Sequence, residues 1–303
     1  MRFAHLLLVS TAVGAWWPGV ALHAQDDRQR VDTTYAFDRG GSLSLEIVSG
    51  EIRVVAGPTN QIRIVASIER GRFETSFSRT RASVEARSVN GRMGNTRIEV
   101  TVPLGTRVRA TSVSGLITVS GTQDEVEAST ISGAVTVSDA AKMIRLGTVS
   151  GSVELERSSG RLEVSSVSGQ VRAVGVSGDF GVESVSGRVS IRDARIRTLR
   201  ASSVSGEVSY EGSFDRTGDY RFNSHSGSLL LSLPANAGAS LDVETFSGRI
   251  SSDFPITLQP GESSARRNRR MHFTLGDGAT RISAETFSGN ITIRRAVSRD
   301  DQE

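Results

Sequence analysis

Apolar and polar residues alternate on both sides of a recurring Ser-Gly pair. Apolar residues stand two and four positions after the glycine, as Ile117 and Val119 follow Gly115, and seven and five positions before it, as Val108 and Ala110 do. Alternation with a period of two is typical of short strands that bury one face. Each repeat is therefore predicted to hold two strands that meet at a Ser-Gly corner.

The corner glycines set the length of the repeat. Their spacing is constant from Gly115 to Gly187, becomes slightly longer after that, and is about twice as long near each end of the chain, which is room for two turns. Such a period indicates a stacked array whose terminal repeats differ from the central ones. The eleven corner glycines are Gly50, Gly91, Gly115, Gly133, Gly151, Gly169, Gly187, Gly206, Gly227, Gly248 and Gly289.

Stacking buries the apolar faces that a single repeat would leave exposed. Equivalent strands of successive coils then hydrogen-bond about 4.8 Å apart. We predict an all-β fold, namely a parallel β-solenoid (β-helix-like) of coils of about 18–21 residues with two main sheets. The corner glycine is expected to favour positive φ and to leave no room for a Cβ atom. The serine before it is expected to hydrogen-bond to nearby backbone rather than to act as a nucleophile.

Charged residues recur six positions before the corner glycine. They alternate in sign over five coils, in the order Glu85, Arg109, Glu127, Arg145 and Glu163. Alternation predicts ion pairs between neighbouring coils, each contributing about 0.2–1 kcal/mol. The alternative is a binding stripe for a charged polymer, which is disfavoured because self-complementary charges leave little net field for a ligand.

The N-terminus has the features of an export signal. Arg2 precedes an apolar run from Phe3 to Trp17, and small residues follow it. Such a pattern is typical of a secretory signal peptide, and the run is too short for a transmembrane helix. We therefore predict a signal peptide over residues 1–24, a linker over 25–40, the solenoid over 41–296 and a charged tail over 297–303. The expected location is the periplasm or the cell surface.

Composition excludes several kinds of protein. The chain has no cysteine, so neither a disulfide nor a cysteine-linked lipid anchor is expected. Its 36 basic residues are balanced by 33 acidic ones, which is not the charge of a nucleic-acid-binding protein. Outside the signal peptide the histidines are His225 and His272, too few for a zinc site. No metal or other cofactor is expected, and His225 is interpreted as a corner packing residue.

No set of residues predicts catalysis. The G-x-S-x-G motif is absent, and the acidic residues are spread along the repeats. Sugar-cleaving enzymes need paired carboxylates, which here would have to come from a loop. The alternative to a non-catalytic protein is thus a polysaccharide-active β-helix enzyme with its site in residues 212–220, which hold Asp215 and Asp219, or in residues 255–272.

The densest positive charge lies in a segment rich in proline, glycine and serine. It consists of Arg266, Arg267, Arg269 and Arg270, with Asn268 among them. In an exported protein these arginines would suit an anionic glycan, lipid headgroup or polymer. The alternative is an ordinary solvated loop, because runs of charge are common on protein surfaces.

Several motifs together resemble a known family. They are the repeated Val-Ser-Gly coils, the strand end Val102-Pro103-Leu104-Gly105, the matching Leu233-Pro234-Ala235-Asn236 and the closing stretch from Glu285 to Ile291. Over residues 41–296 the chain is similar to the bacterial putative-adhesin family, a β-strand-repeat domain of unknown function. The resemblance implies a β-solenoid in the cell envelope. We expect a non-catalytic adhesin or scaffold that binds an envelope polymer, glycan or protein through its solenoid face.

Overall fold

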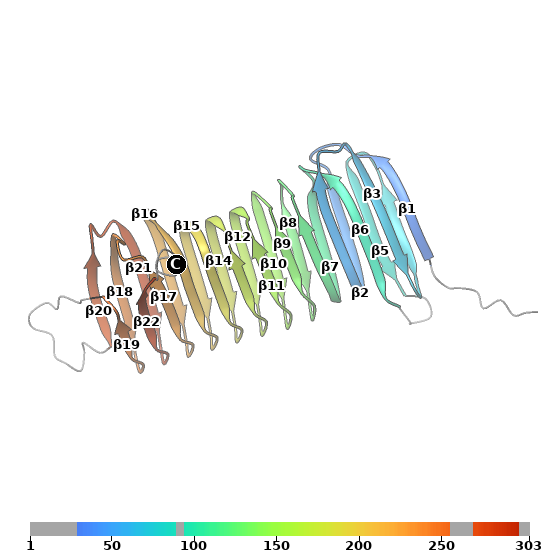
Figure 1. Ribbon diagram of the computed structural model, residues 1–303. Helices are drawn as coiled ribbons and strands as arrows, with labels where there is room; N and C mark the ends of the chain where they lie inside the picture. The colour runs from blue at the N-terminus through green and yellow to red at the C-terminus, as the bar shows by residue number, and fades with distance from the viewer. Residues whose placement is uncertain (1–28, 89–93, 255–268, 297–303) are drawn as a thin grey trace, which may run out of the picture.

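Every regular element of the described chain is a β-strand. The computed structural model describes residues 29–88, 94–254 and 269–296, and its strands stack side by side into an elongated array (Figure 1). The 22 described strands hydrogen-bond into a single sheet. The prediction of an all-β fold is confirmed.

The central coils form two parallel ladders. The first ladder holds the strands that precede each corner glycine, and the second ladder holds those that follow it. The central strands are β7 (Arg107–Ser120), β8 (Val126–Thr130), β9 (Val135–Ser138), β10 (Met143–Thr148), β11 (Val153–Glu156), β12 (Ser159–Ser166), β13 (Val171–Val174), β14 (Ser177–Ser184), β15 (Val189–Ser203) and β16 (Val208–Ser224). Strands β8, β10, β12 and β14 pair in the first ladder, whereas β9, β11 and β13 pair in the second.

The register of these ladders follows the glycine interval. Val126 pairs with Ile144, Ile144 with Leu162, and Leu162 with Phe180, so that each partner lies one glycine interval further along the chain. All four side chains are buried, as the alternation predicted. The ladders are not two separate sheets, because β7, β15 and β16 each continue from one ladder into the other and join all the strands.

The N-terminal end departs from a simple parallel stack. Its strands are β1 (Gln29–Ala36), β2 (Ser42–Gly57), β3 (Gln61–Ile68), β4 (Arg72–Phe77), β5 (Arg81–Arg87) and β6 (Thr96–Pro103). Strands β5 and β6 run parallel to β2, but β3 is antiparallel to β1 and β6, and β4 is antiparallel to β5. The first long interval therefore supplies antiparallel strands rather than two further turns. Strand β1 also lies within the residues that were predicted to be a linker.

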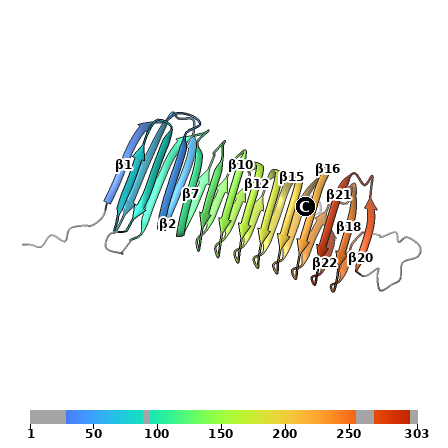
Figure 2. The ribbon, with the colours of Figure 1, turned by 180° about the vertical axis from the view of Figure 1, so that it is seen from behind.

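At the C-terminal end the coils do not follow the order of the sequence. The strands are β17 (Leu229–Leu233), β18 (Ala239–Thr245), β19 (Ile250–Ser252), β20 (Arg270–Leu275), β21 (Thr280–Thr286) and β22 (Ile291–Arg295). Strand β21 pairs with both β16 and β18, and β22 pairs with both β17 and β19 (Figures 1 and 2). The last coil is thus inserted between its two predecessors, and β20 covers β18 as an antiparallel edge strand.

Close stacking explains the corner glycines, but positive φ does not. Of the ten corner glycines in the described ranges, only Gly50 has a positive φ. At Gly151, Gly169 and Gly187, a Cβ atom would overlap the carbonyl oxygen of the corner glycine in the preceding coil. The expected lack of space is confirmed, whereas positive φ is wrong for every described corner except Gly50. Gly91 lies outside the described residues.

A column of buried hydroxyl groups supports these corners from inside. At the corners from Gly151 to Gly289, a serine or threonine stands three residues before the glycine, and its oxygen accepts a hydrogen bond from the glycine N–H. At Gly187 the donor–acceptor distance to Ser184 Oγ is 3.0 Å. The serine directly before the glycine does something else: the Ser186 hydroxyl donates to the Val167 carbonyl of the preceding coil at 3.2 Å. Both hydroxyls therefore stabilise the corner. The sequence predicted such a hydrogen bond only for the serine directly before the glycine.

Candidate binding face

One apolar residue per coil points into solvent at the corner. The inward positions lie seven, five and three residues before the glycine, so the residue two before it faces outward. We call this column the apolar stripe: Val48, Val113, Ile131, Val149, Val167, Val185, Val204, Phe287 and Phe246, with exposed fractions of 43–61%. Solvent-exposed apolar rows of this length are unusual in soluble proteins and mark binding surfaces.

Three rings close the stripe at its C-terminal end. His225 replaces the apolar residue in one coil, and it stacks on Phe287 with ring centroids 5.1 Å apart. Phe287 stacks in turn on Phe246 at 4.9 Å, with their planes 7° apart. Insertion of the last coil creates this arrangement, because it places Phe287 between the other two rings. His225, interpreted from the sequence as corner packing, is an exposed member of this stack.

The outer face of the first ladder is hollowed along its length. A hollow of about 480 Å³ lies over β2, β5 and β7, and one of about 780 Å³ lies over β8, β10, β12, β14 and β15. A third, of about 730 Å³, lies beside the apolar stripe from Val167 to Phe246. The second and third share Ser165, Glu183 and Ser202, so they form one continuous trough.

Small residues form much of the floor of the trough. Four positions before the corner glycine stand Ser129, Gly147, Ser165 and Ser202, with Glu183 between the last two. A Cβ atom at Gly147 would lie 3.5 Å from the Ser165 hydroxyl oxygen and 3.8 Å from the Cβ of Ser129, which are ordinary contacts. Packing therefore does not require glycine there. A glycine within a strand weakens it and often marks close approach by another molecule.

Alternating charges form the wall opposite the stripe. Arg109 Nη2 lies 2.6 Å from Glu127 Oε2, and Arg145 Nε lies 3.2 Å from Glu163 Oε2. Both pairs join neighbouring coils, so the predicted ion pairs are present at these positions. Further along this column, the neighbours are not those that the order of the repeats predicts. Arg221 pairs in register with Ser283 of the inserted coil rather than with a residue of the next repeat.

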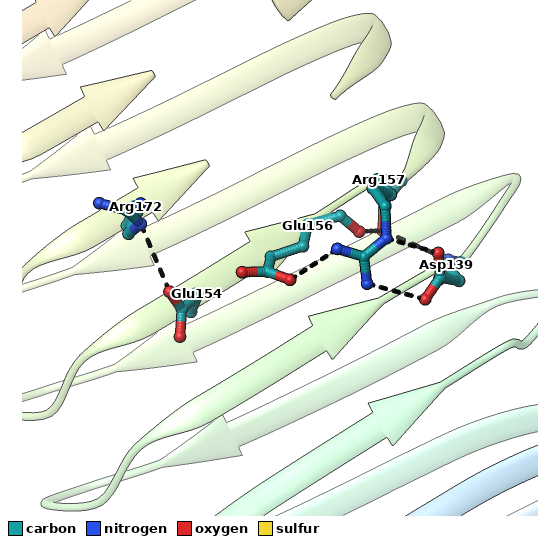
Figure 3. A network of polar contacts seen from close by, with 7 residues as sticks. Asp139, Glu154, Glu156, Arg157 and Arg172 are labelled. Atoms are coloured by element: carbon teal, nitrogen blue, oxygen red, sulfur yellow. Dashed lines mark hydrogen bonds and ion pairs between the residues drawn. The ribbon is translucent and has the colours of Figure 1, made fainter. Parts of the chain in front are cut away.

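Ion pairs between coils also stabilise the surface away from the trough. Arg157 contacts Asp139 of the preceding coil at 2.9 Å and its own neighbour Glu156 at 2.9 Å, and Glu154 contacts Arg172 of the next coil (Figure 3). The hydrogen bond from Arg157 holds the pKa of Asp139 below its usual range. At the margin of the trough, Arg197 lowers the pKa of Asp179 in the same way. These carboxylates are thus committed to structural contacts.

The arginines proposed from the sequence are only partly within the described chain. Arg266 and Arg267 lie outside the described residues. The Arg269 carbonyl accepts a hydrogen bond from the Thr245 N–H at 2.6 Å, and Arg270 Nε lies 3.7 Å from Glu244 Oε2. Arg270 therefore faces an acidic partner within the chain, and the structure does not bring the four arginines together as one described site.

Segment 212–220, predicted to be a loop, lies within strand β16, and its acidic residues are engaged in local contacts. Asp215 accepts hydrogen bonds from the Thr217 N–H at 2.9 Å and from its hydroxyl at 2.8 Å. Both bonds lower the pKa of Asp215, and the bond from the Thr217 backbone N–H has the larger effect. Asp219 pairs with Arg221 at 2.9 Å. Nearby, burial raises the pKa of Tyr210 and of Tyr220, whose rings lie inside the coil.

Within the described ranges, no cluster of three or more His, Asp or Glu residues has a geometry that suits a metal ion. His272 Nδ1 lies 2.7 Å from Asp242 Oδ1 on the edge strand β20. His225 follows β16, which is separated from β20 by β21 and β18. Across the same described residues, no helix is long and apolar enough to cross a membrane.

Comparison with known families supports the repeat architecture. The model of the Toastrack DUF4097 domain matches residues 51–294. The chain belongs to the Toastrack DUF4097 family. Its members share a domain of unknown function, so the resemblance to an adhesin-like repeat family is confirmed without a defined activity. No curated protein matches the chain.

Two solved structures are similar to this Toastrack chain. One, from Clostridium sporogenes ATCC 15579, is described as a "putative cell adhesion protein"; it is 9% identical, covers 88% of this chain and 100% of its own, and has a TM-score of 0.24. The other, from Parabacteroides distasonis ATCC 8503, is described as a "putative lipid binding protein"; it is 8% identical, covers 89% and 97%, and has a TM-score of 0.37.

Proposed function

We propose that this protein is a non-catalytic binding module of the cell envelope, which holds an elongated polymer or protein in the trough of its first ladder. The observation that carries the proposal is the apolar stripe, which stays exposed from Val48 to Phe246 and lines one wall of the trough from Val167 to Phe246. Removal of apolar surface from water by a partner contributes about 25 cal/mol per Å² of favourable free energy to binding.

The pattern of charge supports a partner that follows the long axis. Beside Val113, Ile131, Val149 and Val167 the adjoining outward positions hold only serine, threonine or glycine. The charged pairs lie further out, as Arg145 and Glu163 do. An apolar centre with charge kept to the margin is the composition of protein interfaces.

The corner is rigid enough to present such a surface. From Gly151 onward, each corner is fixed by the hydroxyl that accepts from its glycine and by backbone hydrogen bonds to the preceding coil, such as Ser168 N to Val149 O at 2.8 Å. A preformed face loses little conformational freedom when it binds, so more of the contact energy appears as affinity.

Catalysis is not part of this proposal. The carboxylates Asp139, Asp179 and Asp215 are held by hydrogen bonds that lower their pKa values, which suits structural contacts better than proton donation near neutral pH. Export through the predicted signal peptide would place the trough in the periplasm or on the cell surface, where it can reach envelope polymers and proteins.

A substitution experiment in the source cells tests the proposal. In the variant Val167→Ser/Val185→Ser/Val204→Ser, the stripe loses its apolar character, and we expect the protein to pass from the envelope fraction into the soluble fraction after mild lysis. Because these side chains are about half exposed, the thermal unfolding midpoint should stay nearly unchanged.

The matched control is Val55→Ser/Leu116→Ser. These side chains are 43% and 38% exposed but lie outside the stripe. The control should be retained in the envelope like the unaltered protein. Equal retention of the stripe variant, the control and the unaltered protein would contradict the proposal.

A further inference from the structure

Three strands at the C-terminal end of the trough share one outward pattern. Each carries a glutamate two residues before its stripe residue: Glu183 before Val185, Glu285 before Phe287 and Glu244 before Phe246. The residue between each pair is a buried serine or threonine. A carboxylate and an apolar side chain therefore point out of the same strand face, side by side, in each of the three coils.

Two of these carboxylates are direct neighbours. Glu244 and Glu285 are register partners on the adjacent parallel strands β18 and β21. Like charges opposite each other destabilise a sheet. The same ladder also contains oppositely charged neighbours such as Arg109 and Glu127, and other like-charged pairs such as Arg200 and Arg221. The pairing of two glutamates is thus an energetic cost that a positively charged partner would remove.

Few contacts within the described chain offset that cost. Glu285 accepts a hydrogen bond from the Ser283 hydroxyl at 3.2 Å. Glu244 has the guanidinium of Arg270 at 3.7 Å, and both side chains are more than half exposed. No ion pair reaches Glu183 from the described residues.

The hollow of about 730 Å³ brings these features together. Glu183, Glu244 and Glu285 line it beside Val185, Phe287 and Phe246, and none of the described residues that line it is a lysine or arginine. Arg200 and Arg221 are register partners in the neighbouring outward column. The positive charges of Arg200 and Arg221 would repel a basic group from that column. The basic group would therefore bind at the glutamates.

We propose that the occupant of this hollow is an extended polypeptide segment that carries lysine or arginine together with apolar side chains. The aliphatic stem of a basic residue would lie along the stripe, and its charged head would reach the carboxylate two residues away. The rings of Phe246 and Phe287 add attraction for a cation. Arg270 beside Glu244 shows the same pairing within the chain. The inference rests on the proposed function, because it assumes that the trough binds a partner.

Three synthetic peptides of one length test the chemistry of the occupant. They repeat Lys-Val-Ser, Gln-Val-Ser or Glu-Val-Ser, carry a fluorescent label, and are titrated with the full chain while anisotropy is measured. We expect the lysine peptide to bind at least about tenfold more tightly than the glutamate peptide, with the glutamine peptide between them. The advantage of lysine should shrink as salt is raised.

Variants then locate the binding. Glu244→Gln/Glu285→Gln should weaken the lysine peptide about tenfold and leave the glutamine peptide unchanged. The control Glu154→Gln/Glu207→Gln removes the same charge from outside the trough, where these residues pair with Arg172 and Arg188. It should bind the lysine peptide like the unaltered protein. Thermal unfolding should show that both variants fold.

Each contrary result has a distinct meaning. Equal binding of all three peptides would overturn the preference for a basic partner and leave the proposed function standing. Equal weakening by the two double variants would show general attraction to the surface and overturn this site. Displacement of the lysine peptide by spermine at equal concentration would replace the polypeptide with a small polycation. Loss of envelope retention in the stripe variant is measured separately, so failure of the proposed function is recognised by itself.

Discussion

The carbonyl oxygen of Gly151 occupies the space that a Cβ atom on Gly169 would need. The same relationship recurs at every described corner of the central stack, so each glycine is required by the coil before it. Solenoid stacking is thus limited by the backbone at the corner rather than by the volume of the core.

Substitution of a corner glycine should therefore be far more damaging than substitution of a trough glycine. We expect Gly169→Ala to lower the free energy of unfolding by about 1–3 kcal/mol or more, because the corner must shift to admit the methyl group. Gly147→Ala should be neutral or stabilise by up to about 1 kcal/mol, since its added Cβ meets only ordinary contacts. Urea denaturation measures both. Equal destabilisation by the two would contradict this account of the corner.

The two hydroxyl columns should differ in importance. Ser184→Ala leaves the buried N–H of Gly187 without its acceptor, and we expect a loss of about 1–3 kcal/mol in stability. Ser186→Ala removes only an exposed donor to the Val167 carbonyl, with an expected effect within about 0.5 kcal/mol. Chemical denaturation of both variants gives the comparison. A larger loss for Ser186→Ala would show that the outer serine supports the corner.

Acid should weaken the contacts between coils. Because hydrogen bonds from Arg157 and Arg197 hold the pKa values of Asp139 and Asp179 below their usual range, the stabilisation is present above about pH 4 and is lost as the pH falls through the lowered values. The variant Asp139→Asn/Asp179→Asn should lose less thermal stability than the unaltered protein between about pH 5 and pH 2. Melting curves across that range test this, and parallel losses in the two proteins would argue against it.

The inserted last coil should make the C-terminal third depend on the final strands. A chain that ends after Asp277 lacks β21 and β22, so β16 and β17 lose their neighbours, and β18 and β19 lose their connection to the stack. We expect hydrogen exchange to become fast in β16 to β19 and to stay slow in β8 to β13. Protection that survives in β18 would show that this coil can stack directly on β16.

Much of the fold follows from local patterns in the sequence. The alternation around Val126, Ile144 and Leu162 predicts the inward faces, and the constant spacing of the central corner glycines predicts their pairing. The order in which the last coils stack does not follow from these patterns. Asp242 and Ser283 belong to strands β18 and β21, whose apolar and polar residues alternate equally well. Their positions depend on which neighbour each strand meets in space.

The candidate site was only partly visible in the sequence. The stripe could in principle have been predicted, because a residue next to the inward-facing Ser184 must face outward. However, an apolar side chain such as that of Val185 is usually taken to indicate burial. The buried hydroxyl column left a clear signal as well, namely a serine or threonine three residues before most corner glycines. The adjacency of Glu244 and Glu285 could not be predicted, because they belong to different repeats and the order in which the coils stack decides whether they meet.

Site-specific crosslinking in living cells shows whether one partner lies along the apolar stripe. A photoreactive amino acid is placed in turn at Val149, Val185 and Phe246 of the stripe, and at Val55 as an exposed apolar control. We expect the same crosslinked species from all three stripe positions and none from Val55, because one elongated partner follows the stripe. Crosslinks of equal yield at Val55, or no crosslink from the stripe in cells that fold the protein normally, would contradict it.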